Sequence, residues 1–89
     1  MKATAELSLY PLDKKYESII IEFIKELHSV KALEVVTNGM STQVFGTIEN
    51  ILDALKEHLP YTLQQNPAVL VMKLAPGHLK PELLPKEIQ

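Results

Sequence analysis

Residues 33–47, Leu-Glu-Val-Val-Thr-Asn-Gly-Met-Ser-Thr-Gln-Val-Phe-Gly-Thr, hold two runs rich in β-branched residues on either side of Asn38-Gly39. An Asn-Gly dipeptide between two such runs is a strong hairpin signal. We therefore predict strands over 33–37 and about 40–47, joined by a tight turn. Helical patterns flank this hairpin on both sides, so it decides how the other elements are arranged.

Upstream of the hairpin, the pattern predicts a strand followed by a helix. Residues 3–10 alternate between apolar and polar side chains, as in a half-buried strand, and Pro11 ends the run. Asp13 is a candidate N-cap for a helix from residue 14 to about 31. The apolar stripe of this helix is Tyr16, Ile19, Ile20, Phe23, Ile24 and Leu27.

Downstream, a second helix is predicted over roughly 49–65 and a fourth strand over 68–74. Pro60 falls inside the helical pattern, where it removes one hydrogen bond and crowds the preceding turn, so we expect a kink or a split there. Three prolines mark residues 76–89 as a tail that is either loose or laid on a partner surface. The expected division is a domain over 1–75 and a C-terminal tail over 76–89.

The order strand–helix–strand–strand–helix–strand predicts an α+β fold, the ferredoxin-like βαββαβ sandwich, with a four-stranded antiparallel sheet and two helices on one face. By alternation, Ala3, Ala5, Leu7 and Leu9 face the helices. The opposite, open face should carry Thr4, Glu6, Ser8, Tyr10, Glu34, Val36, Asn38, Ser41, Gln43, Phe45, Thr47, Val69, Val71 and Lys73. Because this face holds much apolar area, we expect a second copy of the chain to cover it.

Composition narrows the partners. No cysteine is present, so disulfides and thiolate metal sites are excluded, and the nine basic residues are all lysine. A net charge of −2 without a basic cluster argues against nucleic acid. No apolar run approaches the ~20 residues that cross a bilayer, so we expect no membrane partner. The first residues lack a signal-peptide pattern, which indicates the cytoplasm.

The sequence predicts neither a metal site nor a cofactor, and it favours a binding protein over an enzyme. The three histidines are far apart and lack the spacing of zinc ligands. No Ser–His–Asp order, paired-carboxylate motif or phosphate loop is recognisable. Acylphosphatase-like hydrolysis, an activity found on this fold, depends on an arginine, and the chain has none.

Three segments resemble one known family. They are Leu-Ser-Leu-Tyr-Pro-Leu (7–12), Asn-Gly-Met-Ser-Thr-Gln-Val-Phe-Gly (38–46) and Val-Met-Lys-Leu (71–74). Together they resemble the YkoF-type thiamine-binding family of small ferredoxin-like proteins, over about residues 2–75. The resemblance implies binding of thiamine or its hydroxymethylpyrimidine part and assembly into dimers or tetramers through the sheets. Many members have an acidic residue just before the glycine, where this chain has Phe45.

The ligand-binding residues that the resemblance implies are Ser41 and Thr42 with Gln43 beside them, and Ser8 and Tyr10 of the first strand. Asn38 in the turn and Phe45 on the third strand complete the predicted set. An aminopyrimidine offers ring nitrogens as acceptors and an amine as donor, which Gln and Ser or Thr side chains can satisfy in an apolar pocket. The thiazolium cation would lie over Phe45 or Tyr10, with Glu6 or Glu34 supplying the opposite charge. Because the chain lacks arginine, unphosphorylated ligands should be favoured.

Three functions follow from this reading. The first is a non-catalytic binding protein for thiamine or hydroxymethylpyrimidine that acts as a homo-oligomer. The second is a regulatory or structural interaction module of the same fold with no ligand, in which Ser41, Thr42 and Gln43 are ordinary strand polarity. The third is a small enzyme, which the missing arginine disfavours.

Overall fold

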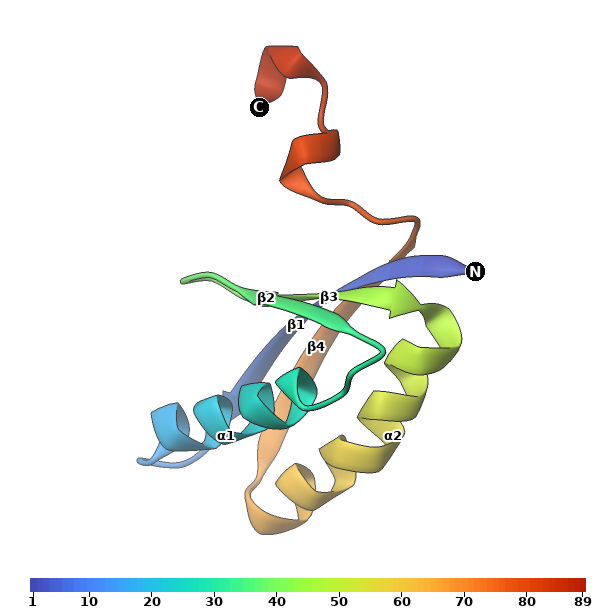
Figure 1. Ribbon diagram of the computed structural model, residues 1–89. Coiled ribbons are helices and arrows are strands. Elements are labelled where there is room, and N and C mark those ends of the chain that lie inside the picture. The colour runs from blue at the N-terminus through green and yellow to red at the C-terminus, as the bar shows by residue number, and fades with distance from the viewer.

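The computed structural model describes residues 1–89. Its elements are β1 (Lys2–Pro11), α1 (Tyr16–His28), β2 (Glu34–Thr37), β3 (Thr42–Thr47), α2 (Ile48–Gln65) and β4 (Ala68–Pro76), followed by two 3₁₀ turns, η1 (Pro81–Leu83) and η2 (Lys86–Ile88). The strands pair antiparallel in the order β2-β3-β1-β4, and both helices cover one face of the sheet (Figure 1). The predicted ferredoxin-like α+β sandwich is confirmed.

The alternation of β1 places the core where the sequence predicts it. Ala3, Ala5, Leu7 and Leu9 are all less than a tenth exposed and lie between the sheet and the helices. They belong to one apolar cluster with residues of both helices, namely Phe23 and Leu27 of α1 and Ile51 and Leu55 of α2. Burial of these side chains holds the two layers together.

The hairpin β2–β3 is confirmed, but its turn is wider than predicted. Asn38 Oδ1 accepts hydrogen bonds from the backbone N–H groups of Met40 (2.7 Å) and Ser41 (3.0 Å). This folds residues 38–41 into a loop, so β3 begins at Thr42 and not at Met40. Gly39 has no positive φ, so the tight turn typical of Asn-Gly is not formed.

The N-cap predicted at Asp13 and the split predicted at Pro60 are not formed. Helix α1 begins at Tyr16, and Asp13 instead accepts a hydrogen bond from the Lys15 N–H (2.7 Å) in the turn before it, so the predicted N-cap is wrong. Helix α2 runs unbroken through Pro60, whose side chain is exposed. It starts with a capped N-terminus, where Thr47 Oγ1 accepts from the Asn50 N–H (3.1 Å).

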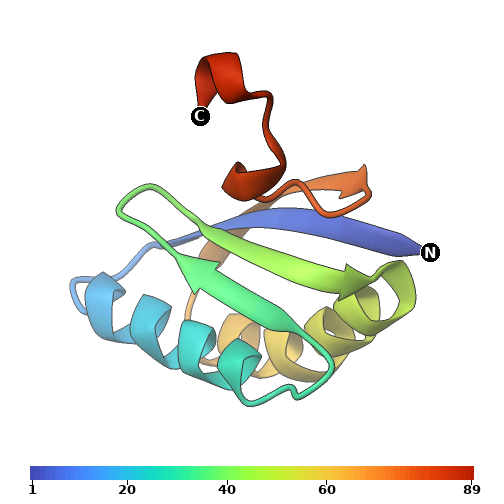
Figure 2. The ribbon, with the colours of Figure 1, turned by 45° about the horizontal axis from the view of Figure 1, so that its top comes forward.

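The beginning of the tail, residues 77–80, lies on the open face of the chain's own sheet (Figure 2). We call this segment the tail base and residues 81–89 the distal tail. Gly77 adopts a φ of +78°, a conformation suited to glycine, and turns the chain back after β4. Thr4 Oγ1 then donates to the Gly77 carbonyl (2.7 Å) and accepts from the Leu79 N–H (2.9 Å).

Side chains of the tail base also cover Phe45. The His78 ring meets Phe45 edge-on at 6.0 Å between centroids, and the Lys80 ammonium lies 5.2 Å from the Phe45 ring centre. Lys80 also pairs with Glu34 at 2.7 Å. Phe45 is consequently only 4% exposed. The expectation of a loose or partner-bound tail is therefore wrong for the tail base, because the chain itself covers this end of the sheet.

The rest of the open face remains uncovered. Tyr10 pairs in register with Val69, and Ser8 with Val71, which confirms that these residues share that face. Tyr10, Val69 and Val71 are each about half exposed. The distal tail projects away from the body as two short turns and does not cover them (Figure 1).

Candidate functional site

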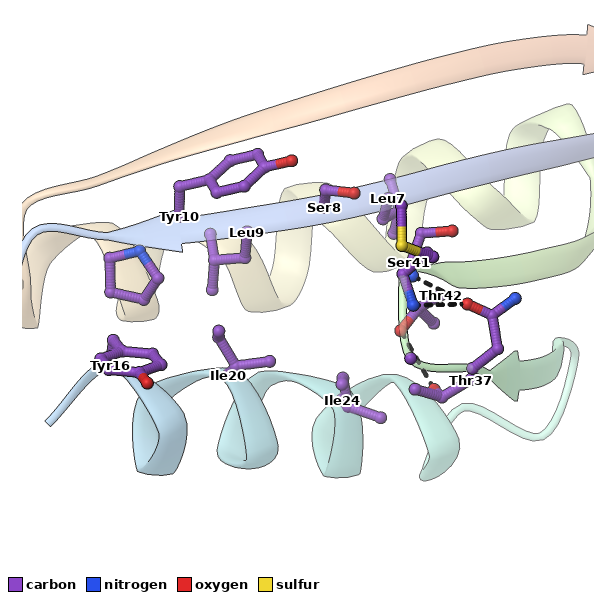
Figure 3. Close-up of a pocket in the computed structure, with 14 residues that line it drawn as sticks. Leu7, Ser8, Leu9, Tyr10, Tyr16, Ile20, Ile24, Thr37, Ser41 and Thr42 are labelled. Atoms are coloured by element: carbon purple, nitrogen blue, oxygen red, sulfur yellow. Dashed lines mark hydrogen bonds between the residues drawn. The ribbon is translucent and has the colours of Figure 1, made fainter.

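A pocket lies where β1 ends, between that strand, the 38–41 loop and α1 (Figure 3). We call it the edge pocket; its volume is about 360 Å³. This falls in the range of small-molecule sites, roughly 300–1,000 Å³. Five of the seven residues predicted to bind ligand line it: Ser8, Tyr10, Asn38, Ser41 and Thr42.

The floor of the edge pocket is apolar. Tyr16, Ile20 and Ile24 follow one another at a spacing of four residues, so they share one face of α1 and point towards β1 (Figure 3). Leu9 reaches down from β1 to meet them (Figure 3). None of the lining residues is charged. Such a surface suits a flat, uncharged ring better than an ion.

The polar groups of the edge pocket come from both ends of the 38–41 loop. Thr42 is 5% exposed, and its Oγ1 lies 3.0 Å from the Oγ1 of Thr37, a distance for one shared hydrogen bond. The side-chain oxygen of Asn38 is engaged by the loop backbone, whereas its amide nitrogen makes no hydrogen bond to the protein. A hydroxyl pair is therefore placed at the pocket wall.

Ser41 and Gln43 lie on the other face of the sheet from Thr42, because neighbouring strand residues alternate. Ser41 Oγ donates to Glu6 Oε2 (2.9 Å) and accepts from Gln43 Nε2 (2.8 Å). The Lys73 ammonium lies 3.6 Å from the other oxygen of Glu6. The three polar residues in a row thus do not form one cluster; two of them belong to a network across the open face.

A second hollow adjoins the edge pocket on the open face. This open-face pocket has a volume of about 340 Å³ and is lined by Glu6, Ser8, Tyr10, Met40, Ser41, Val71 and Lys73. Four of these residues, Ser8, Tyr10, Met40 and Ser41, also line the edge pocket. The edge pocket, which is uncharged and has an apolar floor, therefore continues into the open-face pocket, which is lined by the Glu6 carboxylate.

Phe45 and Gln43 lie apart from the edge pocket. They line a third cavity of about 520 Å³ beneath residues 79–82 of the tail, together with Glu34 and Val36; Asn38 borders both cavities. The Lys80 ammonium already lies over the Phe45 ring and pairs with Glu34. A ligand cation at this position would have to replace a lysine of the chain itself.

Several residues of the edge pocket are not among those predicted from the sequence. Tyr16, Ile20 and Ile24 belong to the predicted apolar stripe of the first helix, which marks them as facing the sheet but not as lining a cavity. The signal that distinguishes them is length. β1 has ten residues and β3 six, so the last part of β1 has no β3 partner above this stretch of helix.

No three histidine, aspartate or glutamate side chains lie close enough together to hold a metal ion. No helix combines the length and apolar character that a membrane span needs.

Comparisons with known proteins agree with this fold. The model of the YKOF-related family matches residues 2–74. A solved Thermotoga maritima protein, provisionally assigned to thiamine biosynthesis or salvage, superposes with a TM-score of 0.80 at 20% identity, over 93% of this chain and 96% of its own. A Streptococcus pneumoniae protein superposes with a TM-score of 0.79 at 23% identity, over 89% of this chain and 90% of its own. A hypothetical protein of Methanocaldococcus jannaschii superposes with a TM-score of 0.73 at 28% identity, over 89% of this chain and 84% of its own. No curated protein matches the sequence.

Proposed function

The chain belongs to the YKOF-related family, and from this premise we propose that it is a non-catalytic, homo-oligomeric protein that binds thiamine or hydroxymethylpyrimidine. The observation that carries the proposal is the edge pocket, where five of the predicted residues surround an uncharged cavity with an apolar floor. The Thermotoga maritima neighbour, provisionally assigned to thiamine biosynthesis or salvage, supports the same ligand class. The expected cytoplasmic location stays a prediction.

The two adjoining pockets match the two halves of thiamine. In the proposed complex the neutral aminopyrimidine ring occupies the edge pocket and packs on Ile20 and Ile24. The thiazolium ring extends into the open-face pocket, where the Tyr10 ring and the Glu6 carboxylate are the groups that attract a cation. Hydroxymethylpyrimidine alone would fill only the edge pocket.

The same arrangement predicts a preference for unphosphorylated ligands. Lys73 is the only basic residue among those that line the two pockets, and its side chain is 80% exposed. An exposed ammonium gives little binding energy, and the chain has no arginine to hold a diphosphate in a bidentate way. Thiamine diphosphate should therefore bind more weakly than thiamine.

Calorimetric titration with thiamine, hydroxymethylpyrimidine and thiamine diphosphate tests the proposal. We expect saturable binding of the first two and weaker binding of the third. Thr42→Val keeps the shape of the side chain, removes a hydroxyl from the pocket wall and should lower the affinity by about tenfold. Thr62→Val is the matched control, since Thr62 is equally buried at 6% but lies on α2 outside both pockets.

A second candidate, an interaction module without a ligand, is favoured by one observation. Ser41 and Gln43 already bind each other and Glu6, so their polarity has an explanation within the chain. No heat from any of the three ligands, on a folded protein that self-associates, would favour this module over the binding protein. Turnover of a phosphate or acyl ester would instead support an enzyme.

A further inference from the structure

The edge pocket lies beside a stretch of β1 that has a strand on one side only. β4 pairs with β1 as far as Pro11, whereas β3 pairs with it only from Lys2 to Leu7. Hydrogen-bonded pairs recur at every second residue of the antiparallel β1–β3 ladder. If the ladder continued beyond Leu7 and Thr42, its next hydrogen-bonded pair would be Leu9 with Met40. The Met40 N–H is bound to Asn38 Oδ1 instead, so the 38–41 loop does not continue the ladder.

The backbone groups left without a partner are those of Leu9. The Lys2 carbonyl accepts a hydrogen bond from the Gly77 N–H, and the Leu12 N–H donates one to the Pro67 carbonyl. The even-numbered residues of β1 therefore direct their backbone groups towards β4 and its ends. Odd-numbered residues direct theirs towards β3. The Leu9 N–H and C=O therefore point into the gap beside the edge pocket, and Leu9 itself is only 6% exposed.

A buried backbone donor and acceptor without partners are unusual, because each costs free energy when it is left unsatisfied. On an extended strand, the N–H and C=O of one residue lie side by side. Their complement is a flat group with an acceptor next to a donor. The ring nitrogen and the neighbouring amine of an aminopyrimidine are such a pair.

We infer that the backbone of Leu9 is the element that recognises the aminopyrimidine: its N–H donates to the ring nitrogen and its C=O accepts from the exocyclic amine. The ring then lies above Ile20 and Ile24, in continuation of the sheet, as a substitute for the missing part of β3. This inference rests on the proposed function. It adds that specificity comes from main-chain groups, which side-chain motifs do not reveal.

Amide hydrogen exchange on the intact protein is the first test, with hydroxymethylpyrimidine as the probe. In the free protein, the Leu9 amide should exchange faster than the Leu7 amide, which the ladder with Thr42 protects. Saturating probe should slow Leu9 by about tenfold or more and leave Leu7 unchanged. A Leu9 amide that is already as protected as Leu7 without ligand would overturn the inference.

A pair of backbone substitutions provides the second test. An ester in place of the peptide N–H of Leu9 should lower the affinity for the probe by about tenfold. The same replacement at Leu7 should cost more stability, because Leu7 lies in the ladder with β3. The inference about Leu9 would be overturned, and the proposed function kept, if calorimetry showed that the probe binds while the Leu9 amide exchange rate and the affinity of the Leu9 ester variant stayed unchanged. Absence of binding by both thiamine and the probe would overturn the proposed function with it.

Discussion

Gly46 of β3 packs closely against the segment leading into β2. A Cβ added there would lie 2.8 Å from Leu33 Cδ2 and 3.4 Å from the Ala32 carbonyl oxygen. Leu33 is flexible at its end and can shift, so Gly46→Ala should lower the free energy of unfolding by only about 1–2 kcal/mol. Urea unfolding measures this loss.

Gly39→Ala is the matched control for that substitution. A Cβ at Gly39 would meet nothing within 4 Å, and its φ is not positive. Alanine should therefore leave the stability unchanged or raise it by up to about 1 kcal/mol, through the unfolded state. Equal losses for both variants would show that the close contact at Gly46 is not the cause.

Thr4 tests the attachment of the tail base. Thr4→Val removes a hydroxyl that makes two hydrogen bonds to this segment, to Gly77 and Leu79, while keeping the side-chain shape. We expect a loss of about 1–3 kcal/mol, measured by urea unfolding. Thr62→Val serves as the control, because Thr62 is as buried as Thr4 but its side chain makes no hydrogen bond in the structure. An equally large loss of unfolding free energy in Thr62→Val would count against the attachment of the tail base by Thr4.

At this scale the sequence predicts which face a residue takes but not what covers it. Period-two alternation correctly separates Thr42 from Ser41 and Gln43, and it places Phe45 on the open face. It contains no information on the tail base, since the contacts of Phe45 with His78 and Lys80 join distant segments. The Leu9 edge is hidden for the same reason: strand lengths become visible only when the strands are paired.

Among the elements, α2 is the one with a local defect. Pro60 lies in its interior, yet the helix continues to Gln65, because buried residues on both sides, among them Leu55 and Thr62, hold it on the sheet. Tertiary packing overrides the local preference here, which is why the predicted split is absent. The hairpin and α1 needed no such compensation, and the periodicity of the sequence alone predicted them.

Pro60→Ala should therefore stabilise the protein. Alanine restores a backbone N–H that can donate to the Lys56 carbonyl, and it removes the crowding of the preceding turn. We expect a gain of about 1–3 kcal/mol in the free energy of unfolding, read from thermal and urea unfolding. Gln64→Ala, at another exposed position of α2, should change it by less than about 0.5 kcal/mol. A loss at Pro60 would mean that the helix depends on the bend of the proline.

The tail consists of two parts that should behave differently. Removal of the exposed distal tail, residues 81–89, should leave the stability nearly unchanged. Removal of residues 78–89 also exposes Phe45 and breaks the hydrogen bond to Leu79, and should cost about 1–3 kcal/mol. Chemical unfolding of the two truncated forms compares them; an equal effect would show that the tail base does not hold the sheet.

For the molecule as a whole, the proposed oligomer should depend on the uncovered part of the open face. Val71→Glu places a charge there and should shift the sedimentation of the protein towards the monomer. Ile21→Glu is matched in exposure, 46% against 47%, but lies on α1 on the other side of the molecule. It should leave association unchanged. A monomeric unsubstituted protein, or dissociation by both variants, would contradict assembly through the sheet.

The central position of β1 in the sheet also has a consequence for biosynthesis. β1 is made first, but its two neighbours are made later, and β4 comes last of the four strands. The hydrogen bond between Thr4 and Gly77 spans 73 positions of the chain. Contacts so distant in sequence slow folding, and until β4 leaves the ribosome one side of β1 stays open to other chains. The sheet can therefore close only after β4 has been made, and chains that still lack β4 are the species that chaperones have most reason to hold.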